Sequence, residues 1–406
     1  MLHNFSFRNF YSFEDWVNVS FRVPVRTPED GRFRSSSSGQ RLSLAQTVLG
    51  ANGAGKTNVL KAAAFFRWFV CSSFQELKAG ERIPYEQFQF CGDSESKPTE
   101  LVFEFDIEGV PYKYELALTP KRVVRETLYH SPSGSFRYLF KRELDPHGDS
   151  YVIRQQGLGL ADTTLRDLTR PNASVLSSIL QIEESPLKKI GDFFNGMSSN
   201  VCEYGRTSHQ LAEHMGEILA AAEFFSDNKA LREKCSSLLT SLDLGLSQVE
   251  LKKEKVKSQK TEEVVEMVFP YGIHEIDGAS YKLHLVRESN GTQNLFVLLR
   301  YLLPVLQTGS VAIIDEFEVD LHPHMIAPIL DLFFSSATNP KGAQLLFSCH
   351  SVEVLRELDK TQVLLVEKDE RCRSEAWRLD EMKGVRRDDN WYAKYLSGAY
   401  HAVPRI

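Results

Sequence analysis

The chain has 406 residues, of which 42% are hydrophobic and 25% are charged. This composition is typical of a folded globular protein with a large core, and it excludes a disordered or fibrous chain. The apolar runs are too short to span a bilayer, and residues 1–10 lack the pattern of a secretion signal. We therefore expect a cytoplasmic protein that makes no membrane contact.

The net charge of −6 excludes a chain-wide attraction to nucleic acid. Local basic clusters occur, but such runs usually form solvated faces, so nucleic-acid binding is kept only as an alternative. The six cysteines show no paired spacing, which argues against a disulfide framework or a zinc site and predicts buried free thiols. The basic clusters are Arg32, Arg34 and Arg41, and Lys252, Lys253, Lys255, Lys257 and Lys260; the cysteines are Cys71, Cys91, Cys202, Cys235, Cys349 and Cys372.

The first part of the chain places one strand–turn–helix unit between two regions of strand-like alternation. The second of these regions predicts a β-rich lobe. The expected elements are strands over 1–25, a flexible loop over 26–41, a buried strand over 44–49, a helix over 57–79, an irregular stretch over 80–98, a hairpin over 101–118 and further strands to about 153.

The second part of the chain begins with helical, polar sequence over 160–245, where Leu211, Met215, Ile218, Leu219 and Ala222 share one predicted face. Further on, short apolar strands alternate with helical segments, which is typical of a parallel α/β sheet. The expected elements are a helix over 289–307 and strands over 311–314, 344–347, 363–366 and 375–379.

Residues 50–57 read Gly-Ala-Asn-Gly-Ala-Gly-Lys-Thr and fit the pattern G-x-x-x-x-G-K-[ST] at every position. Small residues let backbone N–H groups approach phosphate oxygens, while Lys56 supplies a positive charge and the Thr57 hydroxyl ligates Mg²⁺. The predicted strand before the loop and the helix after it supply the required context. We therefore predict that ATP, with Mg²⁺, is bound by Asn52, Gly53, Ala54, Gly55, Lys56, Thr57 and Asn58.

An acidic pair, Asp315 and Glu316, follows the buried strand over 311–314. The carboxyl end of a parallel strand is where ligands are usually bound, so Asp315 is predicted to hold Mg²⁺ together with Thr57. Glu316 is predicted to orient or deprotonate the attacking water, and His350, after the next strand, to sense the γ-phosphate. The predicted catalytic residues are thus Glu316, His350 and Lys56. By contrast, we expect His322 and His324 to shape a turn and not to bind metal.

A second anion site is predicted at residues 289–292, where Ser289, Gly291 and Thr292 open the apolar helix. One phosphate site is already present in the chain. A second γ-phosphate site near the acidic strand therefore suggests that another subunit completes the nucleotide site.

Together these motifs, with Asp320 in the loop after the acidic pair, resemble the ATP-binding-cassette head of SMC-type and OLD-type ATPases. The resemblance is closer to the compact ATPases of bacterial phage-defence systems, which include the AbiL (RloA-like), PARIS, Septu and retron-associated ATPases. Residues 9–13, 103–118, 288–298 and 395–404 also resemble that subgroup, whereas residues 160–260 are explained least.

The resemblance implies an α/β fold: a P-loop ABC-type ATPase head with a β-rich lobe and an inserted helical region. It divides the chain into an N-terminal half of the head over 1–159, a helical insertion or lid over 160–260, and a C-terminal half over 261–406. Asp320 departs from the small residue usual in its loop, and His401 from the usual glycine. The family's Q-loop glutamine is not placed, although Gln87 and Gln89 are candidates.

The resemblance further implies that two copies enclose two ATP molecules, and that hydrolysis loosens the homodimer or a higher homo-oligomer. Only 56 residues follow His350, which is too few for the nuclease domain of OLD proteins. We therefore expect a separate effector, such as a toprim- or HNH-type nuclease, and a phage trigger protein.

The expected function is that of a regulatory ATPase in an anti-phage, abortive-infection system, and three alternatives are less favoured. An SMC-like DNA-repair or DNA-binding ATPase is disfavoured because residues 160–260 lack sustained heptads. A transporter subunit is disfavoured by the 233 residues between Lys56 and Ser289. A module that binds ATP without hydrolysis is disfavoured because Glu316 and His350 are both present.

Overall fold

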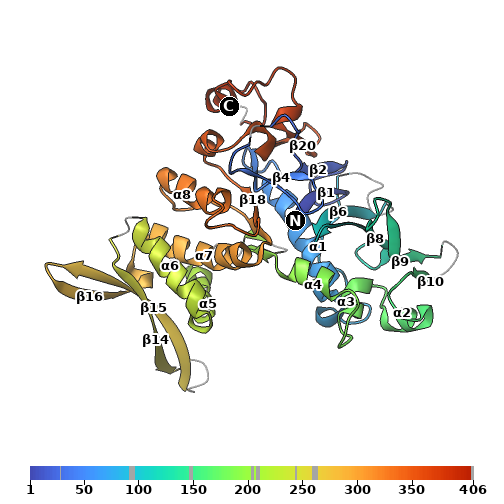
Figure 1. The fold of residues 1–406 in the computed structure, drawn as a ribbon, viewed down its shortest axis with the longest axis horizontal. Helices are drawn as coiled ribbons and strands as arrows, with labels where there is room; N and C mark the ends of the chain where they lie inside the picture. The colour runs from blue at the N-terminus through green and yellow to red at the C-terminus, as the bar shows by residue number, and fades with distance from the viewer. Residues whose placement is uncertain are drawn as a thin grey trace.

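A computed structural model describes residues 1–406 except 28, 91–96, 146–149, 203–204, 207–210, 243–244, 258–263 and 404–406. A six-stranded sheet and a long helix, α1 (Lys56–Glu76), lie at its centre, and two wings extend from it (Figure 1). None of the described helices combines the length and apolarity that a bilayer crossing requires.

The first large sheet has six strands in the order β11-β17-β18-β5-β19-β20, and all its neighbours are parallel except the last pair. Its four inner strands are short and buried on both faces, as expected for a sheet covered by helices. The predicted parallel α/β sheet is therefore confirmed. The strands are β11 (Ser198–Ser199), β17 (Val311–Ile314), β18 (Gln344–Ser348), β5 (Ala45–Gly50), β19 (Val363–Lys368) and β20 (Ser374–Arg378).

The second large sheet has seven antiparallel strands in the order β10-β9-β8-β7-β6-β1-β2 and forms the predicted β-rich lobe. Its strands are β1 (Leu2–Arg8), β2 (Val17–Ser20), β6 (Thr99–Ile107), β7 (Val110–Leu118), β8 (Val123–His130), β9 (Arg137–Leu144) and β10 (Tyr151–Gln155). Helices α2 (Asp162–Leu168), α3 (Val175–Ile179) and α4 (Lys188–Asn195) complete this wing (Figure 1).

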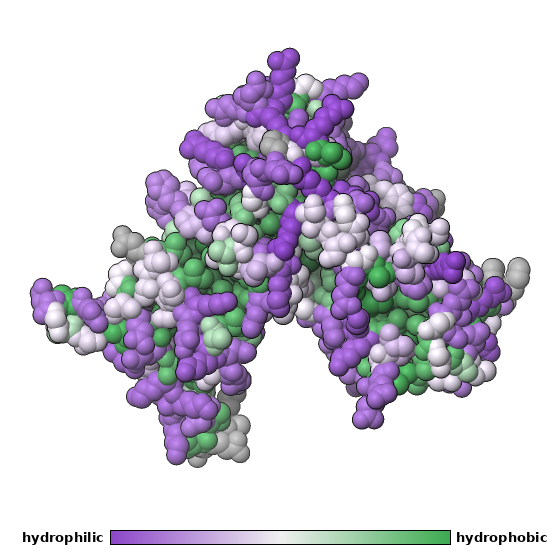
Figure 2. Space-filling model, viewed as in Figure 1, coloured by the Kyte–Doolittle hydropathy of each residue, from purple (hydrophilic) through white to green (hydrophobic). Residues whose placement is uncertain are grey.

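The opposite wing carries helices and a separate three-stranded antiparallel sheet (Figure 1). Figure 2 shows a notch between the two wings. The elements of this second wing are α5 (Leu211–Asp227), α6 (Lys229–Ser241), β14 (Gln248–Lys257), β15 (Val264–Ile276), β16 (Ala279–His284) and α7 (Asn290–Thr308). The remaining elements are the β3–β4 hairpin (Phe33–Ser35 and Arg41–Ser43), the β12–β13 pair (Val201–Cys202 and Gly205–Arg206), α8 (Pro323–Phe334) and α9 (Trp391–Leu396).

The parallel sheet separates two hydrophobic cores because successive side chains of a strand point to opposite faces. In β17, for example, Ile313 belongs to the core that contains α1 and the lobe, whereas Ile314 belongs to the core that contains α7. Helix α1 covers one face of the sheet and α7 covers the other. Both helices therefore pack against the same central strands.

Four sequence-based expectations need correction. Residues 26–41 are not simply a loop, because the β3–β4 hairpin begins there. The region 160–260 is not only helical: β11 joins the central sheet and β14 is a strand, although the boundaries of the three predicted parts remain a prediction. Met215 is 40% exposed and lies outside the buried face of α5. The thiols of Cys202 and Cys372 are exposed rather than buried, and Cys91 lies outside the described residues.

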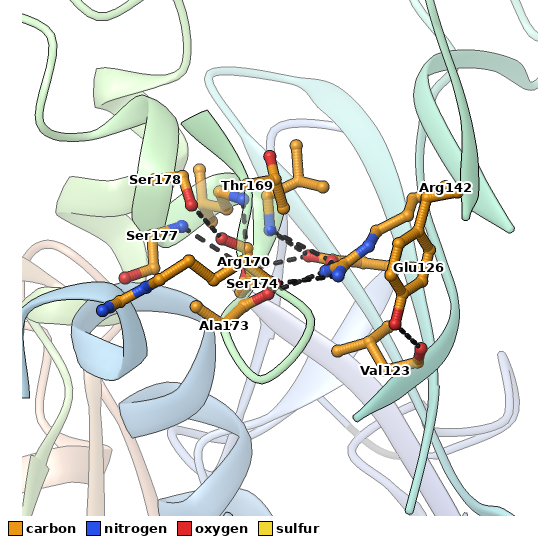
Figure 3. Close-up of polar contacts among 12 residues, drawn as sticks. Val123, Glu126, Arg142, Thr169, Arg170, Ala173, Ser174, Ser177 and Ser178 are labelled. Atoms are coloured by element: carbon orange, nitrogen blue, oxygen red, sulfur yellow. Dashed lines mark hydrogen bonds and ion pairs between the residues drawn. The ribbon is translucent and has the colours of Figure 1, made fainter. Parts of the chain in front are cut away.

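A buried ion pair joins the lobe to the helices beside α1 (Figure 3). Glu126 on β8 and Arg142 on β9 are both fully buried, with 3.6 Å between Nη1 and Oε2. Arg142 donates to the carbonyl oxygens of Ala173 and Arg170, each at 2.8 Å. Glu126 accepts from the Ser174 hydroxyl at 2.7 Å and the Val175 N–H at 3.0 Å, at the start of α3. The pair therefore fixes the loop before α3 onto the lobe.

Arg142→Met should lower the free energy of unfolding by about 3–5 kcal/mol, because it leaves the Glu126 carboxylate buried without its counter-charge. The double variant Glu126→Gln/Arg142→Met should recover part of this loss. Urea unfolding would measure both, with Arg125→Met on the exposed side of β8 as the matched control. Equal stability of Arg142→Met and the control would contradict this role.

Candidate active site

The loop between β5 and α1 has the backbone shape that its glycines permit. Gly53 and Gly55 have φ values of 74° and 116°, in the left-handed region that favours glycine. A Cβ on Gly50 would lie 2.2 Å from the carbonyl oxygen of Val366 on β19, so no larger residue fits there. Asn52 and Gly53 are exposed. The loop thus opens to solvent at the N-terminus of a 21-residue helix, which is a favourable place for an anion.

Lys56 lies inside this loop and is only 6% exposed. Its Nζ donates to the carbonyl oxygens of Gly50 at 2.9 Å and Ala51 at 3.1 Å. Burial lowers the pKa of Lys56, and the nearby carboxylates, Asp315 first among them, oppose that shift. The ammonium group is therefore held between the loop and the acidic strand, where phosphate oxygens would compete for it.

The Asp315 carboxylate is 3% exposed and receives a hydrogen bond on each oxygen. Thr57 Oγ1 donates to Oδ2 at 2.8 Å, and Ser348 Oγ donates to Oδ1. A hydroxyl and a carboxylate at hydrogen-bond distance form the kind of oxygen pair that binds Mg²⁺, which usually takes its other ligands from water and substrate phosphates. Among the described residues there is no cluster of three or more His, Cys, Asp or Glu that could hold a metal.

Two residues that hold the acidic strand were missed by the sequence analysis. Asn200, after β11, accepts from the Asp315 N–H at 2.8 Å and donates to the Asp315 carbonyl at 3.1 Å. Ser348, at the end of β18, accepts from the Glu316 N–H at 2.8 Å. The Ser348 signal was available, because it precedes Cys349 and His350 at the end of a predicted strand. Asn200 could be found only by knowing that the two-residue strand β11 pairs with β17.

Glu316 and His350 follow the adjacent strands β17 and β18, and their side chains lie next to each other. Glu316 Oε1 is 4.0 Å from His350 Nε2, and the two side chains are 32% and 42% exposed. Glu316 has a φ of 51°, an uncommon backbone conformation for a non-glycine residue. The His350 N–H donates to the Glu318 carboxylate. Both groups are thus accessible to a water or a phosphate, and their catalytic roles remain predictions.

Ser289 is the N-cap of α7: its Oγ accepts from the Thr292 N–H at 3.2 Å and lies 2.9 Å from Thr292 Oγ1. A Cβ on Gly291 would lie 2.8 Å from the carbonyl oxygen of Asp320, and Asn294 donates to the Asp320 carboxylate at 2.8 Å. The start of α7 and the loop after β17 are therefore locked together within one chain. Ser289 is exposed, and no described contact joins it to the P-loop, which is the phosphate-binding loop of residues 50–57.

Other candidate residues have local partners. The amide of Gln87 donates to the Lys97 carbonyl at 2.7 Å and that of Gln89 to the Glu86 carboxylate at 3.2 Å. The amide of Asn58 donates to Ser12 Oγ at 2.8 Å, which braces α1 against the turn after β1. His322 caps α8 by accepting from the His324 N–H.

The basic clusters are largely paired within the chain. Arg34 donates to the carbonyl oxygens of Asn339 and Pro340, and Arg32 pairs with Asp30. Lys252 pairs with Glu254, and Lys253 lies 3.8 Å from Glu266. Lys260 lies outside the described residues. These contacts favour a structural role for the described parts of both clusters.

A scan against family models matches residues 47–356 to the family described as "AAA domain, putative AbiEii toxin, Type IV TA system". The chain belongs to this AAA-domain family. Membership in a P-loop ATPase family implies ATP binding. The match begins in β5, and it includes both the P-loop and the acidic pair.

The structure of this AAA-domain chain is similar to two solved SMC heads. One is the SmcHead bound to the C-winged helix domain of ScpA, with 12% identity, a TM-score of 0.43, and coverage of 94% of this chain and 98% of that one. The other is the Smc head with an extended coiled coil bound to the C-terminal domain of ScpA, derived from Pyrococcus furiosus, with 11% identity, a TM-score of 0.47, and coverage of 98% and 99%. Comparison with curated proteins gave no match.

A histidine on β15 connects the three-stranded sheet to the start of α7 in this AAA-domain chain. His274 Nε2 lies 2.8 Å from the carboxylate of Glu288, the residue before Ser289, and its Nδ1 lies 2.8 Å from the Gly245 carbonyl. With an acceptor at each ring nitrogen, the charged imidazolium is favoured, and the hydrogen bond to Glu288 raises the pKa of His274 above 6.5.

Because this pKa is raised in the folded state, the contribution of His274 to stability should be complete below its unfolded value and lost as the pH rises through its folded value. His274→Gln should therefore differ most from wild type at about pH 5.5 and least at about pH 8.5. Urea unfolding midpoints at both pH values would test this, with Tyr281→Phe on β16 as the control. A wild-type-to-variant difference that grows with pH would contradict it.

Proposed function

We propose that this chain is the ATP-hydrolysing regulatory subunit of an anti-phage defence system, which controls a separate toxic effector such as a nuclease. Two copies would enclose ATP, and hydrolysis would set the lifetime of the closed assembly. The proposal combines an ATPase activity, a two-copy site and a defence role, and each part has its own support.

The observation that carries the ATPase activity is the convergence of five residues at one edge of the parallel sheet. Lys56 and Thr57 follow β5, Asp315 and Glu316 follow β17, and the Thr57–Asp315 and Glu316–His350 distances are 2.8 and 4.0 Å. Most of the catalysis in phosphoryl transfer comes from positioning the reacting groups and from stabilising the charge on the phosphate oxygens. These residues could supply both effects.

Each residue has a distinct part in the proposed reaction. Lys56 and the loop N–H groups would bind the β- and γ-phosphates, and Glu316 would orient the attacking water and accept its proton. His350 would contact the γ-phosphate. Mg²⁺, held by Thr57 and Asp315, would neutralise charge that develops on the phosphate oxygens.

The two-copy site is supported by the exposed start of α7. Ser289 presents a helix N-terminus with an exposed hydroxyl, which suits an anion. In the described chain this group makes no contact with the P-loop, so a second copy would bring it to the γ-phosphate. ATP would then favour the closed assembly through contacts made only across the interface.

The defence role is supported by the family description, which associates these domains with a putative toxin of a toxin–antitoxin system. It is tested by phage plating on cells that express the chain with its neighbouring genes. We expect protection with the wild-type chain and loss of protection with Lys56→Ala. Full protection by Lys56→Ala would separate defence from nucleotide binding.

Glu316→Gln should lower the ATP turnover rate by about 10²–10⁴-fold while ATP binding is retained, because the amide cannot accept the proton of the attacking water. It should also prolong the closed assembly. Steady-state phosphate release and light scattering would measure the two effects, and Glu233→Gln on α6 is the matched control. Turnover at the wild-type rate in Glu316→Gln would remove this residue from the catalytic role.

A further inference from the structure

A cavity of about 350 Å³ lies along α1, and its lining includes none of the predicted residues of the candidate active site. This volume is within the range of small-molecule sites. Residues 61, 64, 65 and 68 of α1 face it because helical residues three and four apart share a face. The other walls come from the turn after β1 and from Ser199, Val201 and Cys202.

The apolar wall of the cavity is a continuous row of aromatic rings. The Tyr11 ring contacts Phe10 with centroids 4.8 Å apart, Phe10 contacts Phe65 at 5.9 Å, and Phe65 contacts Trp68 at 6.0 Å. Phe10 and Phe65 are buried, whereas Tyr11 and Trp68 are only partly covered. Tyr11 and Trp68 therefore give the cavity an aromatic wall against which a flat apolar group can pack.

Two cations line the same cavity. The Lys61 ammonium lies 4.3 Å from the centre of the Tyr11 ring. Arg67 donates from Nε to the Phe194 carbonyl at 3.2 Å, but neither of its terminal nitrogens has a hydrogen-bond or ion-pair partner among the described residues. Burial lowers the pKa of Arg67, yet a guanidinium stays charged in proteins. The terminal nitrogens of Arg67 are therefore available as hydrogen-bond donors to an anion that enters the cavity.

One carboxylate also lines the cavity and must be counted against an anion. Glu76 accepts from Trp68 Nε1 at 2.6 Å, which fixes the indole ring, and its charge acts on Arg67 through space. A ligand with a single acidic group suits a cavity in which one carboxylate stands beside Lys61 and Arg67.

We propose that this cavity binds a small amphipathic organic anion, with its flat apolar part against Tyr11 and Trp68 and its acidic group on Arg67. Arg67 is ten residues beyond Thr57, which is about 15 Å along the helix axis. The acidic group is thus well separated from the phosphates at the P-loop, and the binding does not depend on the proposed ATPase activity.

The position of the cavity gives its ligand a route to the acidic strand. Ser199 belongs to β11, and the next residue is Asn200, which holds the Asp315 backbone on both sides. Cys202 belongs to β12, which pairs with β13, and a Cβ on Gly205 would lie 3.8 Å from the Thr57 methyl group. A bound anion would therefore contact residues 199–202, which lie next to both Thr57 and Asp315 in the fold.

The binding can be tested with 8-anilinonaphthalene-1-sulfonate, a flat aromatic anion whose fluorescence rises in apolar sites. The whole chain is titrated with this probe, with and without saturating ATP. Arg67→Met should weaken binding by roughly 10–100-fold, the worth of a charge-assisted hydrogen bond, whereas Arg137→Met at the exposed start of β9 should not. Unchanged affinity in Arg67→Met, or displacement of the probe by ATP, would overturn the proposal.

A second measurement uses the exposed thiol at the cavity and does not require a change in α1. In a Cys91→Ser/Cys372→Ser variant, the probe should slow the reaction of Cys202 with a maleimide. Conversely, maleimide-labelled protein should lose probe binding. Labelling of Cys202 at the same rate with and without the probe would contradict a ligand in this cavity, whatever the ATPase activity of the chain.

Discussion

The hydrogen bonds around Asp315 are the constraint on which the rest of the site depends. A carboxylate that is 3% exposed is stable only when its oxygens are satisfied, and here Thr57 and Ser348 each bind one oxygen. Asn200 holds the backbone of the same residue from the other side. Three strands that lie far apart in the sequence are therefore connected at one residue, next to the P-loop lysine.

The rest of the fold holds this point in place. Helix α1 brings Lys56 and Thr57 from the end of β5, and its far half packs against α3, which the Glu126–Arg142 pair fixes to the lobe. On the opposite face of the sheet, α7 packs against β17 and carries Ser289 to the loop that contains Asp320. Changes in either wing thus have a direct structural connection to the acidic strand.

The sequence predicted those parts of the fold whose signal is local. The strand over 311–314 and the helix beginning near Ser289 were placed to within a residue or two, because apolar runs and an N-cap serine carry the information by themselves. The glycine-rich loop before Lys56 was also predicted from local sequence. Its glycines are spaced as required for a backbone that approaches phosphate closely.

What was missed depends on pairing between distant residues. Asn200 acts from a strand of only two residues, which has no periodicity to detect, and its partner Asp315 is 115 residues away. Strand β14 is dominated by charged residues, so it lacks the regular apolar alternation that marks a strand in sequence. The exposure of Cys202 depends on its surroundings in the folded chain, which composition alone could not indicate.

The central claim is that two copies of the chain form each ATP site. It is tested most directly by mixing two inactive variants, Lys56→Ala and Ser289→Arg, and measuring ATP turnover. A mixed dimer has one site in which Lys56 from one copy meets Ser289 from the other, so the mixture should recover roughly a quarter of wild-type activity, since about half the dimers are mixed and each has one intact site of two. A mixture no more active than either variant alone, or full activity of Ser289→Arg by itself, would contradict the account.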